Sequence, residues 1–257
     1  LYVTSDTIYV TNLADTATID RSDGISLREA IAIAAADVTG SQTIVFAPSL
    51  AGQTIHLDSE LTLTEGLTFD ASAAAGLKIS GSSINQGATS QTWINSGALT
   101  IASNITGTGT LLKQGTGTLH LTGSNTNTGA AEIRAGQLSV DGSYAGAITV
   151  NAGAMLQGTG SVGATTVQSG GTLLAGHAED YTAGILTING NLTMAEGSEW
   201  KVNLRGSEPG TGYSQLVVNG GVAISVNSFG SVGSFQPDQE YVLIVNDGTD
   251  PIVGKIL

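Results

Sequence analysis

An apolar–polar–apolar triplet recurs through the middle of this sequence at a spacing of about twenty residues. The triplets start at residues 77, 99, 119 and 138: Leu77-Lys78-Ile79, Leu99-Thr100-Ile101, Leu119-His120-Leu121 and Leu138-Ser139-Val140. Because side chains alternate between the two faces of a strand, each triplet predicts a short strand with one buried face. No helical pattern lies between them, and repetition at this period is typical of a solenoid. We therefore predict an all-β parallel β-helix, with Leu119 stacked on Leu138.

Residues 111–142 contain the most regular part of this pattern, with short alternating runs separated by Gly, Asn, Thr and Ser, the residues of turns. The block resembles the passenger-associated transport repeat, also called the autotransporter-associated β-strand repeat. Asn127 stands where that family usually has an aromatic residue. The resemblance implies a structural and export role for the matching residues, which are Lys113, Gly115, Gly117, Leu119, Leu121, Asn125, Thr128, Gly129, Ala135, Gly136 and Leu138.

The first forty residues differ from the rest, because they contain the one convincing helix pattern. Leu1-Tyr2-Val3 and Ile8-Tyr9-Val10 predict strands, and Gly40 offers a helix stop. Ser26 and Glu29 form a capping-box pair ahead of an apolar stripe of Leu27, Ala30, Ile31 and Ala34. An amphipathic helix here could cover the open end of a solenoid, whose unpaired edges need protection.

The same segment resembles an N-terminal module named for its Ser-Leu-Arg-Glu-Ala motif, present as Ser26, Leu27, Arg28, Glu29 and Ala30. Ile25 stands where that family often has Cys. The resemblance implies the start of a right-handed parallel β-helix in a secreted protein.

Residues 143–257 continue the alternating runs with looser spacing. Asn189-Gly190 and Asn219-Gly220 predict that some hairpins are mixed in. This half resembles the C-terminal stem of autotransporter passengers, with Ser214 where that family often has Asp. The resemblance implies a membrane barrel in the full-length protein, which this sequence lacks. We predict one domain over 1–257, with cap and first coils at 1–70, central coils at 71–142 and stem coils at 143–257.

Composition limits the partners. Eight Lys and Arg against 21 Asp and Glu give a net charge of −13, which disfavours nucleic acid and anionic membranes. The chain has no Cys, so neither disulfides nor Cys-ligated metals are available. No apolar run approaches the ~20 residues of a membrane span. No signal peptide is visible at Leu1, and we expect a mature, monomeric fragment.

Candidate chemical groups are sparse. The neighbouring acids Glu179-Asp180, Glu196/Glu199 and Asp247/Asp250 are interpreted as surface turns, and the last pair is a weak candidate for Ca²⁺. Of the three histidines, His56 and His120 alternate with apolar residues and are expected to point to solvent, while His177 stands apart. Trp93 and Trp200 could stack on sugars, although core packing is favoured because of the area that a Trp buries.

These observations favour a secreted passenger or stalk at the bacterial cell surface, structural or adhesive, that assists its own outer-membrane export. We assign no catalytic, cofactor or metal site, and leave the partner as an unidentified surface glycan or host or matrix ligand. The main alternative is a carbohydrate-binding or polysaccharide-degrading β-helix, a lyase or glycoside hydrolase, which two converging acids in a cleft would favour. A third is ice or mineral binding through the threonines of 108–110 and 116–118.

Overall fold

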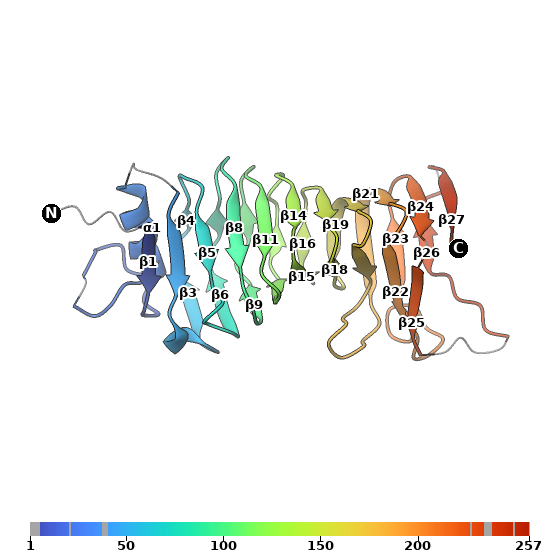
Figure 1. Ribbon diagram of the computed structural model, residues 1–257, viewed down its shortest axis with the longest axis horizontal. Helices are drawn as coiled ribbons and strands as arrows, with labels where there is room; N and C mark the ends of the chain where they lie inside the picture. Colours follow the sequence, from blue (N-terminus) through green and yellow to red (C-terminus); the bar gives the residue numbers. More distant parts are fainter. Residues whose placement is uncertain are drawn as a thin grey trace.

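The computed structural model is an elongated parallel β-helix that describes residues 6–20, 22–37, 41–226, 228–233, 238–248 and 250–256. The chain winds from the helical N-terminal end to the last coils at the opposite end of the rod (Figure 1). Every ladder between the named strands is parallel, which confirms the predicted all-β solenoid.

Three stacks of strands form the walls of the rod. The first sheet follows the order β1 (Thr7–Val10), β2 (Thr43–Phe46), β5 (Thr68–Asp70), β8 (Gln91–Ile94), β11 (Leu111–Gln114), β14 (Ala131–Ile133), β17 (Ile148–Val150), β19 (Ser161–Val167), β21 (Ile185–Met194), β23 (Gln215–Val218) and β26 (Ile244–Asn246). Joined to it are β13 (Ser124–Asn125), β16 (Ser143–Tyr144), β24 (Val222–Val226) and β27 (Ile252–Ile256).

The second sheet contains β3 (Thr54–Leu57), β6 (Leu77–Gly81), β9 (Leu99–Ile101), β12 (Thr118–Leu121), β15 (Gly136–Val140), β18 (Ala154–Gln157), β20 (Thr172–Leu174), β22 (Glu199–Asn203) and β25 (Ser228–Val232). The third sheet contains β4 (Leu61–Thr62), β7 (Ile84–Asn85) and β10 (Ile105–Thr106). A short 3₁₀ helix, η1, spans Pro48–Leu50.

The core is a set of apolar ladders that run along the rod axis. Leu119 pairs with Leu99 on one side and with Leu138 on the other, as predicted. The ladder continues from Leu138 through Leu156 and Leu173 to Trp200. A side chain of this size stabilises the fold by about 1.5–3 kcal/mol when it is fully buried. The repeat period is therefore fixed by the need to stack like residues on successive coils.

The predicted N-terminal helix is confirmed as α1 (Leu27–Ala35), which lies beside β1 at the end of the rod (Figure 1). Ser26 accepts a hydrogen bond from the Glu29 main chain, and the Glu29 carboxylate accepts one from Ser26 N. The predicted stripe of Leu27, Ala30, Ile31 and Ala34 is buried. The strand predicted at Ile8-Tyr9-Val10 is part of β1, whereas Leu1-Tyr2-Val3 and Gly40 lie outside the described residues.

The hairpins predicted at the two Asn-Gly pairs are wrong. Asn189-Gly190 lies inside β21 and turns a corner of the coil, with φ +138° at Gly190. The two halves of β21 pair in parallel with β23 and β24, which flank Asn219-Gly220. The coil geometry overrides the local preference of Asn-Gly because the apolar residues on both sides must stay in their ladders.

Candidate functional site in the repeat coils

Lys113 is the least expected residue of the repeat coils, because a lysine side chain is fully buried there. Its Nζ atom donates to the carbonyl oxygens of Gln114 at 2.6 Å, Gly115 at 2.9 Å and Ala135 at 3.2 Å. Burial lowers the pKa of the Lys113 ammonium to about 8. Since Ala135 belongs to the following coil, the lysine ties two successive corners together.

The matching glycines lie at corners where successive coils approach closely. Gly115 and Gly136 have φ values of +76° and +67°, a region that favours glycine. A Cβ atom at Gly115 would collide with the carbonyl group of Asn95 on the preceding coil, and one at Gly117 would collide with the carbonyl of Gly97. The glycines of the motif therefore allow the backbone corners to stack.

The Asn125 side chain forms hydrogen bonds next to the last strand of the third sheet, β10, in place of main-chain pairing between strands. Its Oδ1 atom accepts from Ile105 N at 2.7 Å, and its Nδ2 atom donates to Ser143 O at 2.8 Å. One buried amide thus joins the preceding and following coils. This satisfies both ends of the side chain, as a buried polar group requires.

Asn127 stands where the transport repeat usually has an aromatic residue, and its side chain contacts a tyrosine of the next coil. Asn127 Nδ2 donates to the Tyr144 hydroxyl at 3.0 Å and to Gly109 O at 2.9 Å. The Tyr144 hydroxyl donates to Gly129 O at 3.0 Å, and burial raises the pKa of this tyrosine. An aromatic ring is therefore present at this corner, supplied by a residue 17 positions further along.

The remaining matching residues hold the walls together. Leu119, Leu121 and Leu138 are fully buried in the core ladders. Thr128 is exposed, and its main-chain N–H donates to Gly107 O at 3.1 Å. The arrangement joins coils through main-chain carbonyls, amides and apolar contacts.

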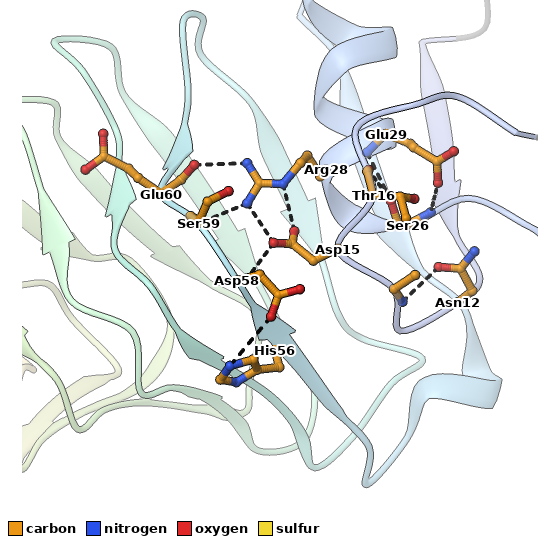
Figure 2. A network of polar contacts seen from close by, with 11 residues as sticks. Asn12, Asp15, Thr16, Ser26, Arg28, Glu29, His56, Asp58, Ser59 and Glu60 are labelled. Carbon is orange, nitrogen blue, oxygen red and sulfur yellow. Dashed lines mark hydrogen bonds and ion pairs between the residues drawn. The ribbon is translucent and has the colours of Figure 1, made fainter.

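The N-terminal motif forms a second structural site, in which Arg28 fastens the cap to the first full coil (Figure 2). Arg28 binds Asp15 through Nε and Nη2, both at 2.8 Å. The same guanidinium donates to Ser59 O at 2.7 Å and to Glu60 O at 2.9 Å. Burial raises the pKa of Asp15, but hydrogen bonds from Arg28 and from Asp58 N outweigh it, so the pKa is lowered.

A polar cluster on the outer face of the second sheet was not predicted from the sequence. His177 Nε2 lies 3.2 Å from Asp141 Oδ1, and Glu179 accepts two hydrogen bonds from Gln157 Nε2 at 2.8 and 2.9 Å. His120 lies beside these groups on the outward side of β12, where it is half-buried. The sequence signal was a change in coil length. Met155 pairs with Thr172, 17 residues further along, whereas Thr172 pairs with Glu199, 27 residues further along, so the second coil holds an insertion.

The remaining candidate acids lie at the surface, and the two candidate tryptophans lie in the core. Glu179, Asp180 and Glu196 are exposed in bends or turns as predicted, while Glu199 belongs to β22. Asp247 and Asp250 are exposed, and no group of three His, Asp or Glu that could hold a metal occurs in the described ranges. Trp93 and Trp200 are buried, with Trp93 stacked on Phe69 at 4.3 Å between ring centroids, so the sugar-stacking alternative is wrong.

The predicted threonine pairs do not form a common face, because Thr118 pairs with Gln137 on the next coil. A different column of outward threonines does align on the first sheet, where Thr68 pairs with Thr43 and Thr92. Leu112 and Glu132 interrupt this column on the following coils. None of the helices among the described residues is both long and apolar enough to cross a membrane.

Residues 111–140 match the passenger-associated-transport-repeat. The match spans β11, β12, β13, β14 and β15, which contain or flank the lysine, glycine and asparagine contacts described above. No curated protein matches the chain. The resemblance of residues 26–30 to the Ser-Leu-Arg-Glu-Ala module stays a prediction.

The transport repeat indicates an autotransporter passenger and implies secretion to the cell surface. It also suggests a non-catalytic, structural segment. The parallel β-helix agrees with such a segment, since each coil is built on its predecessor.

Proposed function

We propose that this chain is the stiff stalk of a cell-surface passenger, structural and adhesive, and that its repeat coils assist its own export across the outer membrane. The observation that carries the proposal is the position of the transport repeat within uninterrupted core ladders. Leu121 at its centre pairs with Ile101 on the preceding coil and with Val140 on the following one. The repeat can therefore template coils on both of its sides.

The physical basis is sequential folding. A solenoid coil needs only its neighbour, so a chain that emerges from a membrane can add coils one at a time. Each coil that forms outside buries apolar area and makes return of the chain unfavourable. The coils from residue 111 onward combine regular ladders with polar ties at Lys113 and Asn125, which makes them the proposed folding nucleus.

The proposal is tested by two matched substitutions in the export-competent protein. Ile79 and Leu121 occupy the same ladder through Ile101, and both are fully buried. Replacement of either by Asp buries a charge and costs several kcal/mol. We expect Leu121→Asp to lower surface display more than Ile79→Asp, as measured by antibody labelling of intact cells with total expression as the control.

Limited proteolysis gives an independent readout of the same nucleus. We expect a resistant C-terminal fragment that begins near Gly107, since coils after this point hold the repeat. Equal display of the two variants, or a resistant fragment from the N-terminal half, would refute the assignment of the nucleus. The adhesive ligand is proposed to be a surface glycan or a host or matrix molecule, bound by a monomeric chain.

A second candidate function, a carbohydrate-binding or polysaccharide-degrading β-helix, is favoured by one observation. Asp141 and Glu179 lie on the same outer face, near His120 and His177. Glu179 is, however, bound by Gln157 and Thr118, and Asp141 accepts from Ser139 and Thr159. Because neighbouring side chains already hold both carboxylates, we favour the structural role.

A further inference from the structure

An open groove lies on the outer face of the second sheet, over β15 and β18 in the middle of the rod (Figure 1). Its volume is about 370 Å³, which lies within the range of about 300–1,000 Å³ that is usual for small-ligand sites. The side chains that line it include Thr116, Gln137, Met155, Thr172 and Lys201. We call this surface the groove.

The floor of the groove is a column of side chains on successive coils. Gln137 pairs with Met155 on the next coil, and Met155 pairs with Thr172 on the coil after that. Their neighbours Leu138 and Leu156 point into the core and are fully buried, which fixes the strands of the floor. Because adjacent strands lie about 4.8 Å apart, the column offers its groups at a regular spacing along the rod axis. Such a column suits an extended ligand that lies parallel to the axis.

Gln137 supplies a hydrogen-bond acceptor that lacks a donor. Its Oε1 atom is shielded from solvent, and no group in the described part of the chain donates to it. A buried acceptor without a donor is destabilising. The Gln137 side chain as a whole is only partly buried, and the terminal torsion of a glutamine is broad, so a rotation turns the oxygen toward the groove. A hydroxyl group of a ligand in the groove would then satisfy it.

One end of the groove holds a lysine and a glutamate. Lys201 Nζ lies 3.3 Å from Glu199 Oε2, and the same oxygen accepts a hydrogen bond from Thr172 Oγ1 at 3.2 Å. The side chains of Lys201 and Glu199 are 38% and 32% exposed, so both can also reach a ligand. The pair has no net charge, and it therefore offers donors and acceptors without attracting an anion.

The surroundings of the groove disfavour an anionic ligand. Glu179 accepts from Thr118 Oγ1 at 3.3 Å, and Thr118 pairs with Gln137 of the floor, which places a carboxylate beside the groove. The chain as a whole carries a net charge of −13. Since like charges repel, a neutral ligand fits this surface better than an acidic one.

The strands beneath the groove leave no free edge for an extended peptide. β15 pairs with both β12 and β18, and β20 pairs with both β18 and β22. A peptide that binds as an added strand needs an unpaired edge. Hydroxyl, amide and charged side chains surround the flexible thioether of Met155, which can pack against the C–H face of a sugar ring. The groove therefore favours a glycan over a peptide.

We propose that the groove binds a neutral oligosaccharide whose chain lies along the rod axis. Sugar hydroxyls donate to Gln137 Oε1 and Glu199 and accept from Lys201 and Thr116, while a ring packs on Met155. This inference rests on the adhesive role proposed above, and it assigns that role a site and a class of ligand.

Methyl NMR of the whole chain tests the proposal, because the sequence contains two methionines. Met155 lines the groove, whereas Met194 is only 1% exposed in the core and serves as the internal control. The chain, labelled with ¹³C at the methionine methyl groups, is titrated with maltohexaose, cellohexaose and chitohexaose up to about 10 mM, which detects millimolar dissociation constants. We expect at least one sugar to shift the Met155 signal saturably and to leave Met194 unchanged.

Three results would overturn the proposal. The first is a Met155 signal that none of the three sugars shifts. The second is a response to hexagalacturonate alone, which would show an anionic ligand. The third is a response to gelatin alone, which would show a peptide site.

Two matched substitutions test the contacts. Gln137→Ala removes one acceptor and is expected to weaken sugar binding about fivefold. Gln114→Ala is the control, since Gln114 is also partly buried but lies on the first sheet, and its variant should bind as the parent does. Equal affinity of both variants would refute the role of Gln137. Should Gln137→Ala fold poorly, seen as a shifted Met194 signal, Thr116→Val replaces it, because Thr116 is exposed and its hydroxyl should likewise contribute to binding.

Failure of the groove can be distinguished from failure of the proposed function. Surface display of Leu121→Asp and Ile79→Asp tests export and does not depend on a ligand. Displaying cells that adhere equally well to a surface coated with the bound sugar, with or without Gln137→Ala, would refute the groove and leave the adhesive role intact. A saturable Met155 shift without adhesion of the cells would support the groove and refute the adhesive role.

Discussion

Removal of the Arg28 side chain should detach the N-terminal cap. The guanidinium makes two bonds to the Asp15 carboxylate and two to main-chain carbonyls of the coil corner at Ser59 and Glu60. The Asp15 side chain is only 2% exposed, so Arg28→Ala leaves a buried carboxylate that keeps only main-chain donors, at Asp58 and Ser59. Loss of one partner of a buried ion pair costs about 3–5 kcal/mol, and we expect a value of about 3 kcal/mol because Asp58 N–H remains.

The matched control is Arg134→Ala. Arg134 also binds a carboxylate, that of Glu132 at 2.9 Å, but its side chain is 47% exposed. An exposed pair of this kind contributes about 0–1 kcal/mol. The contrast between the two variants therefore isolates burial from the mere presence of an arginine–carboxylate pair.

Urea unfolding gives the free-energy difference for each variant, and hydrogen exchange at β1 and β2 reports whether the loss is local to the cap. The coupling is obtained from a double-mutant cycle with Asp15→Asn. Because the pKa of Asp15 is lowered in the folded chain, its contribution is present above its ordinary pKa of 3.8 and is lost as the pH falls through the lowered value. A loss below about 1 kcal/mol for Arg28→Ala, or equal losses for both arginines, would refute the reasoning.

Two further predictions concern the repeat coils and the polar cluster. Because burial lowers the pKa of Lys113 to about 8 from 10.5, the unfolded chain binds more protons between these values, so stability should rise with pH over this range. Lys113→Met should flatten that rise in urea melts, and an unchanged slope would contradict it. Assays against pectin, alginate, xylan and peptidoglycan should give no turnover, whereas a rate abolished by Asp141→Asn would overturn the structural role in favour of the enzymatic one.

Local sequence patterns predicted the elements whose stability depends on near neighbours. The capping box at Ser26 and Glu29 involves residues three apart, and it forms as expected. The ladder from Leu77 to Leu138 was predictable because coils of similar length must place like apolar residues over one another. The match of residues 111–140 to the transport repeat likewise rests on spacing within a single stretch of chain.

The tertiary structure decided the contacts between residues far apart in the sequence. Only the wound coil brings Tyr144 to the corner at Asn127, and only the loop between β20 and β21 brings His177 and Glu179 to Asp141 and His120. The corner at Asn189-Gly190 was misread for the same reason, since ladder pairing outweighs a turn preference that is local. The sequence by itself determined which residues face inward, because alternation is a property of each strand. The outer contacts depend on which coils and loops come to lie side by side, and that is settled only when the neighbouring coils have formed.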